Sequence, residues 1–112
     1  MPEREIMEFT SKQRAYLKSL ASDLDPIFQI GKGSVTPEVV EAVSEVYNTH
    51  ELIKVNILKN CTDDVNEVAR TLADRTRSNL VQVIGRKAVL YKPFKENPEI
   101  ILPKASKKKD VE

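Results

Sequence analysis

The sequence is poor in glycine, cysteine and aromatic residues, and it lacks long hydrophobic runs. Its 112 residues include three glycines, one cysteine, six aromatic residues and no tryptophan. A single cysteine excludes an internal disulfide and fits a reducing compartment, so we expect a cytoplasmic protein. No stretch approaches the roughly 20 apolar residues of a membrane span. The first ten residues contain three glutamates and no apolar run, unlike a signal peptide.

The net charge of +1 conceals an uneven distribution. Residues 70–95 contain seven basic residues and one acid, whereas residues 61–69 contain three acids and no base. Clustered positive charge on a nearly neutral chain is typical of a surface that binds a polyanion. The alternative is a solvated surface that is basic without a ligand.

The length fits one domain with a single core. We expect an N-terminal extension (1–9), one globular domain (10–95) and an extended, flexible basic tail (96–112). The tail contains a lysine run, Lys107-Lys108-Lys109, that is typical of a solubilising segment and could add nonspecific attraction to a polyanion.

Three helices are predicted from their start signals. Thr10 to Gln13 has the S/T-x-x-E/Q form of a capping box, and apolar residues then recur at helical spacing over 11–23, before Asp25-Pro26. Thr36-Pro37-Glu38 combines a hydroxyl N-cap, a first-turn proline and an acid near the positive end of the helix dipole. Thr62-Asp63-Asp64 caps the third helix, which we expect to include two arginines in its last turn.

Four strands are predicted, at 26–30, 51–58, 79–85 and 88–91, the last two joined by a tight turn at Gly85-Arg86-Lys87. The order is helix, strand, helix, strand, helix, strand, strand. Strand–helix–strand connections imply parallel neighbours, and the final hairpin adds an antiparallel pair. The sequence therefore predicts an α/β fold, a two-layer sandwich with a mixed four-stranded sheet.

Two of the three glycines lie in the loop Gly31-Lys32-Gly33-Ser34, between a predicted strand and a helix start. Unpaired N–H groups at a helix N-terminus attract anions, and glycine lets an anion approach the backbone. Lys32 and the Ser34 hydroxyl could then contact a phosphate. The mononucleotide and dinucleotide glycine motifs do not match this spacing, whereas the loop is similar to the G-x-x-G loop of KH domains. The alternative is a tight turn that requires glycine for its own geometry.

Three blocks carry a family resemblance: "TSKQRAYLKSLASDLDPIFQIGKGSVT", "HELIKVNIL" and "NLVQVIGRKAVLYKP". Residues 10–93 resemble a CRM domain, the chloroplast RNA splicing and ribosome maturation module, in its stand-alone bacterial YhbY-type form. The resemblance implies the fold given above, RNA binding, association with precursors of the large ribosomal subunit, and a shape like the C-terminal domain of a bacterial initiation factor. Serine 34 replaces the second glycine of the family loop. Because serine tolerates left-handed φ less well, we expect Gly33 to take the strained position.

We therefore expect a non-enzymatic, monomeric RNA-binding protein that assists ribosome assembly, without a metal, cofactor or small-molecule substrate. The aromatics are too few for extensive base stacking, so contacts should be mainly to phosphates. The predicted RNA-binding residues are Gly31, Lys32, Gly33, Ser34, Lys12, Arg14, Lys18, Arg86 and Lys87. A second group of candidates comprises Lys54, Arg75 and Arg77.

Two other functions stay open. A protein–protein adaptor would use a sheet edge or the solvent side of the second helix, where Glu38, Glu41 and Glu45 fall. A small phosphotransfer enzyme or hydrolase is opposed by the missing motifs. His50 and Cys61 could form a catalytic pair, but no third orienting group is indicated, and a structural role is favoured for both.

Overall fold

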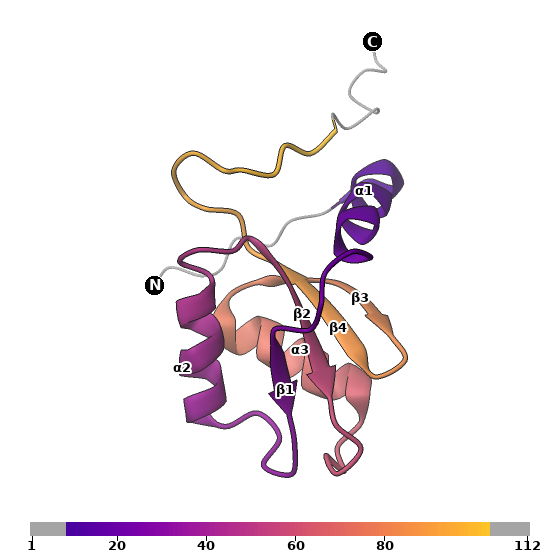
Figure 1. Cartoon of the computed structure of the whole chain (residues 1–112), viewed down its shortest axis with the longest axis vertical. Helices are drawn as coiled ribbons and strands as arrows, with labels where there is room; N and C mark the ends of the chain where they lie inside the picture. The colour runs from indigo at the N-terminus through magenta and orange to yellow at the C-terminus, as the bar shows by residue number, and fades with distance from the viewer. Residues whose placement is uncertain (1–8, 104–112) are drawn as a thin grey trace.

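The computed structural model describes residues 9–103 and contains, among these, three helices and one four-stranded sheet. The elements are α1 (Ser11–Ala21), β1 (Phe28–Ile30), α2 (Pro37–Val46), β2 (Leu52–Ile57), α3 (Val65–Thr76), β3 (Asn79–Ile84) and β4 (Lys87–Tyr91). The strand order is β1-β2-β4-β3 (Figure 1). The β1–β2 pair is parallel, and β4 pairs antiparallel with both β2 and β3. The predicted fold class and mixed sheet are confirmed.

Each helix begins where a side chain can accept a hydrogen bond from a free backbone N–H group. Thr10 and Gln13 form the predicted capping box, with reciprocal bonds of 3.1 Å. The Thr36 hydroxyl accepts from Val39 N at 3.1 Å. At α3 the cap is Asp64, whose carboxylate accepts from two backbone N–H groups. Such caps each stabilise a helix by about 1 kcal/mol, so the local sequence suffices to set these starts.

Several predicted ends are corrected by the structure. Helix α1 ends at Ala21 rather than 23, and β1 begins at Phe28 rather than 26. Arg77 lies just beyond α3 rather than in its last turn, with a left-handed φ of 59°. This residue reverses the chain from α3 into β3, so the helix cannot continue through it.

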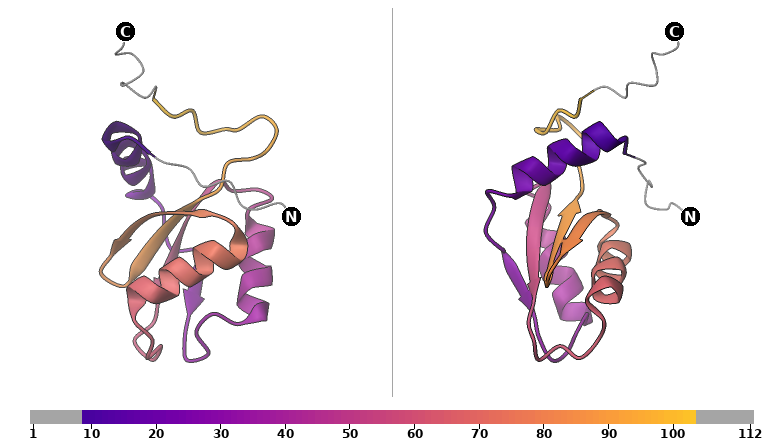
Figure 2. Two further views of the ribbon diagram at one scale, coloured as in Figure 1. Left: turned by 180° about the vertical axis from the view of Figure 1, so that it is seen from behind. Right: turned by 90° about the vertical axis from the view of Figure 1, so that its right-hand side faces the viewer.

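Helices cover the two faces of the sheet unequally. Side chains of alternate residues in β2 and β4 point to opposite faces. Ile53, Val55 and Ile57 pack with α2 and α3 in the main core. Leu52, on the other face, packs with α1 and Tyr91 in a smaller cluster. The two-layer arrangement therefore holds for α2 and α3, while α1 crosses the opposite face near one end of the sheet (Figure 2).

A buried carboxylate attaches the segment that follows β4. Glu51 is 4% exposed, and its carboxylate accepts hydrogen bonds from the backbone N–H groups of Phe94, Glu99 and Ile100 at 2.7–3.0 Å. Gln13 Nε2 adds a bond to Pro103 O at 2.8 Å. This segment, 92–103, is thus held against α1 as an extended strap. The Lys107-Lys108-Lys109 run lies outside the described residues.

Candidate nucleic-acid interface

The connection between β1 and α2 forms a turn that exposes Lys32. Ser34 N donates to Gly31 O at 2.9 Å, which closes the turn around Lys32 and Gly33. Ser34 itself has a left-handed φ of 59°, and Gly33 does not. The expectation that Gly33 takes the strained position is therefore wrong. Serine here adopts a conformation that favours glycine, at a cost of about 1–2 kcal/mol.

Gly31 allows two loops to pack closely. A Cβ atom at this position would lie 3.3 Å from Asn60 Oδ1 and 3.6 Å from Leu58 Cδ1, both in the connection between β2 and α3. Leu58 N also donates to Ile30 O at 2.8 Å. The glycine thus has a structural role in joining the two connections. This supports the alternative interpretation, in which the loop requires glycine for its own geometry. Lys32, in the same turn, is exposed to solvent.

The hairpin between β3 and β4 joins the same end of the sheet. Arg86 donates from Nε to Ile57 O at 2.8 Å and from Nη2 to Leu58 O at 2.7 Å. The guanidinium therefore fastens the hairpin to the end of β2, which limits its availability to a ligand. The next residue, Lys87, is exposed.

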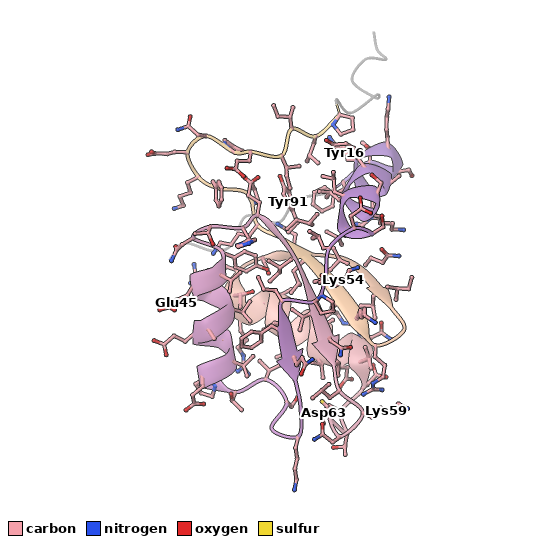
Figure 3. The ribbon with its side chains drawn as sticks, in the orientation of Figure 1. Tyr16, Glu45, Lys54, Lys59, Asp63 and Tyr91 are labelled. Atoms are coloured by element: carbon pink, nitrogen blue, oxygen red, sulfur yellow. The ribbon has the colours of Figure 1, made fainter. Side chains whose placement is uncertain are left out.

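Three connections therefore meet at one end of the sheet, and we call this region the loop end (Figure 1). Its basic residues are Lys32, Lys59, Arg86 and Lys87. Sequence reasoning did not select Lys59, which is exposed in the β2–α3 connection (Figure 3). The sequence feature that could have identified it is its position between a predicted strand end and a helix cap. Asp63 lies in the same connection and reduces the positive charge locally.

The predicted α1 residues lie at the other end of the sheet from the β1–α2 turn (Figure 1). Lys12 and Lys18 are exposed. Arg14 is half-buried, where its Nη1 donates to Val81 O at 2.6 Å and its guanidinium carbon lies 5.4 Å from the Phe9 ring centroid. The structure therefore does not bring these residues together with the Gly31–Ser34 turn.

Arg75 and Arg77 form part of a third basic region, at the C-terminal end of α3. Lys92 Nζ donates there to Thr76 O at 3.2 Å and lies 5.6 Å from the Tyr47 ring centroid. Burial, followed by the charges of Arg77 and Lys95, lowers the pKa of Lys92. Cations at this position are stabilised by the negative end of the helix dipole. This arrangement accounts for the region without a ligand.

The remaining candidates are placed as follows. Cys61 is 3% exposed and packs in the main core, as its structural interpretation predicts. His50 is exposed, with Nδ1 2.8 Å from Thr49 Oγ1. Within residues 9–103, no group of three or more His, Cys, Asp or Glu residues could hold a metal ion. Tyr91 is buried at 2% exposure, whereas Tyr16 is 38% exposed and reaches solvent.

The exposed acidic side of α2 begins next to the loop end, because Glu38 lies in the first turn of the helix. Glu38, Glu41 and Glu45 are all exposed, as the helical spacing predicts. Glu45 points outward from the far end of α2 (Figure 3). None of the helices among the described residues has the length and apolar character that a membrane crossing requires.

The fold and its basic loop end define a small α/β domain of the kind suited to a polyanion. The family model of the CRS1 / YhbY (CRM) domain matches residues 9–92, and the chain belongs to this family. It is 49% identical over 94 residues to Probable RNA-binding protein YqeI of Bacillus subtilis, covering 84% of this chain and 98% of that protein. It is 33% identical over 95 residues to an RNA-binding protein of Haemophilus influenzae, covering 85% and 95% respectively.

A solved structure shares the fold. The solution structure of protein SAV1595 from Staphylococcus aureus is similar with a TM-score of 0.72 and 50% sequence identity. The match covers 86% of this chain and all of that one.

Proposed function

We propose that this chain is an RNA-binding protein whose loop end contacts phosphates of the RNA backbone. The observation that carries the proposal is the exposed Lys32, in a turn directly before the N-terminus of α2, in a member of the CRM family. Lys59 and Lys87 are exposed in the two neighbouring connections. Backbone N–H groups at the helix start add partial positive charge. Several phosphates can therefore be neutralised together.

We further infer that the RNA is rRNA in a precursor of the large ribosomal subunit. This rests on the family resemblance of the three sequence blocks. The protein would act as a monomeric, non-enzymatic assembly factor in the cytoplasm. Neutralising phosphates reduces the repulsion between RNA segments while they fold.

Sedimentation of a cell lysate, with this protein detected in each gradient fraction, tests the proposal. We expect co-migration with a large-subunit precursor at low salt and its loss at high salt, because phosphate contacts are screened. Lys32→Ala should weaken the association at low salt, and Glu45→Gln serves as a control on the exposed side of α2. A protein that stays at the top of the gradient under both conditions would contradict the proposal. Retention of a protein partner after nuclease treatment would then support the adaptor function.

A further inference from the structure

Within residues 9–103, one face of the sheet is only partly covered by other elements, and the uncovered part is mostly polar. The strand register places Gln29 beside Asn56, Asn56 beside Lys87, and Lys87 beside Ile84. These four residues form one row that crosses all four strands. They lie on the same face as Leu52 and Tyr91, which α1 covers further along the sheet. We call the row, together with the neighbouring Lys54 and Gln82, the open face.

The open face lies between the loop end and α1. Gln29 is two residues before Gly31, and Lys87 directly follows the hairpin turn that reaches the end of β2. In the other direction, Lys54 is two residues from the α1-covered Leu52. A chain bound at the loop end and extended toward α1 would therefore cross the open face.

The composition of the open face is that of a ligand-binding surface. None of the four strands contains an acidic residue, while Lys54 and Lys87 supply positive charge. Asparagine is disfavoured in strands, so β-propensity does not account for Asn56 in the central strand β2. Ile84 is 56% exposed and adds an apolar contact.

The three amide side chains here are available for hydrogen bonding. Two other polar side chains of the domain are engaged: the Gln13 amide bonds to Thr10 N and Pro103 O, and the Arg86 guanidinium bonds to two carbonyls. By contrast, within residues 9–103 no hydrogen bond engages the side chains of Gln29, Asn56 or Gln82. An amide offers both donors and an acceptor, which is the pattern that base edges require.

We propose that the open face binds unpaired RNA nucleotides, whose bases contact the amides while the loop end holds the adjoining phosphates. This inference rests on the proposed RNA-binding function and deepens it. The positive charge and the absence of acidic residues in the strands favour an anionic ligand, and the proposed function makes that ligand RNA. The amides favour unpaired base edges over a duplex, whose bases are already paired. With no aromatic side chain in the row, hydrogen bonds rather than stacking would carry the recognition.

The test compares two fluorescent RNA probes by anisotropy, using the full chain. One is a hairpin with a loop of about ten unpaired nucleotides, and the other is a blunt duplex with the same number of phosphates. We expect the wild-type protein to prefer the hairpin. The double variant Gln29→Val and Asn56→Val keeps strand-forming residues and should bind the hairpin about five- to tenfold more weakly, since two hydrogen-bonding groups are lost. Its affinity for the duplex should change less than about twofold.

Controls separate this proposal from the general one. The double variant removes no charge, so its salt dependence should equal that of the wild type. Lys32→Ala should weaken both probes, and Asn48→Ala, an exposed amide beyond α2, should change neither. Urea unfolding of each variant verifies the fold. Unchanged hairpin binding by the folded double variant, or an equal loss for both probes, would overturn the open-face proposal alone. A wild-type protein that binds neither probe would overturn the RNA-binding function as well.

Discussion

Replacing Glu51 by glutamine tests whether one buried carboxylate holds the C-terminal strap. The carboxylate accepts three backbone N–H bonds, from Phe94 to one oxygen and from Glu99 and Ile100 to the other. A glutamine can keep one acceptor oxygen but must turn its NH₂ group toward the remaining donor. If the oxygen stays with Glu99 and Ile100, Phe94 N loses its acceptor.

The magnitude follows from these three bonds. Leaving a buried donor unsatisfied costs about 1–3 kcal/mol, and each of the other two bonds weakens by about 0.5–1 kcal/mol on becoming neutral. We therefore expect Glu51→Gln to lower the free energy of unfolding by about 2–5 kcal/mol. This is a large part of the roughly 5–15 kcal/mol typical of a domain.

Urea unfolding measures the loss, and amide hydrogen exchange locates it. The amides of Phe94, Glu99 and Ile100 should exchange faster in the variant, even if the sheet stays protected. Glu45→Gln makes the same chemical change on an exposed residue and should alter stability by less than about 0.5 kcal/mol. If Glu51→Gln unfolds at the wild-type urea concentration with unchanged exchange at these amides, the anchoring role of the carboxylate is refuted.

Three further predictions concern the loop end and the core. Ser34→Gly should raise the free energy of unfolding by about 0.5–1 kcal/mol, because glycine adopts the left-handed φ without strain. The control Ser34→Ala should not raise it, and equal effects of the two substitutions in urea unfolding would contradict the strain at this position. Arg86→Ala should lower the free energy of unfolding by about 1–3 kcal/mol, because two hydrogen bonds to backbone carbonyls are lost. Lys87→Ala should change it by less than about 0.5 kcal/mol, and equal losses for the two variants would contradict the role of Arg86 in fastening the hairpin to β2. Burial raises the pKa of Tyr47 from 10.0 to about 12, with partial opposition from the Ser78 and Thr76 hydroxyls, so the folded state holds the phenol proton more tightly. Stability should therefore be unaffected by this group below pH 10 and fall as the pH rises toward 12, and Tyr47→Phe should lessen that fall in alkaline unfolding.

Local signals predicted much of the fold. The caps at Thr10, Thr36 and Asp64 depend on side chains within three residues of the bonds they make, so the sequence displays them directly. Strand β2 could be identified because its burial alternates at Ile53, Lys54, Val55, Asn56 and Ile57 and so requires alternating polarity. The first and last strands were identified instead as short apolar runs next to turn residues. The strand order with β4 between β2 and β3 needed the tertiary structure.

The site was less predictable because its contacts are distant in sequence. Nothing near Glu51 indicates that its partners lie more than 40 residues away. From the sequence, Arg14 and Arg86 were interpreted as cations available to RNA, yet each donates to a backbone carbonyl on another element. The separation of α1 from the Gly31–Ser34 turn, at opposite ends of the sheet, likewise depends on tertiary packing.

The most direct test of the central claim is the affinity for an rRNA hairpin measured across a range of salt concentrations, with wild-type protein and Lys32→Ala. The account predicts that log Kd rises linearly with log salt concentration, and that Lys32→Ala weakens binding and lowers the slope by about one. Control substitution Glu45→Gln should leave the slope unchanged. If the wild-type protein fails to bind at low salt, or if Lys32→Ala matches it in both affinity and slope, the loop end is not the phosphate-binding site.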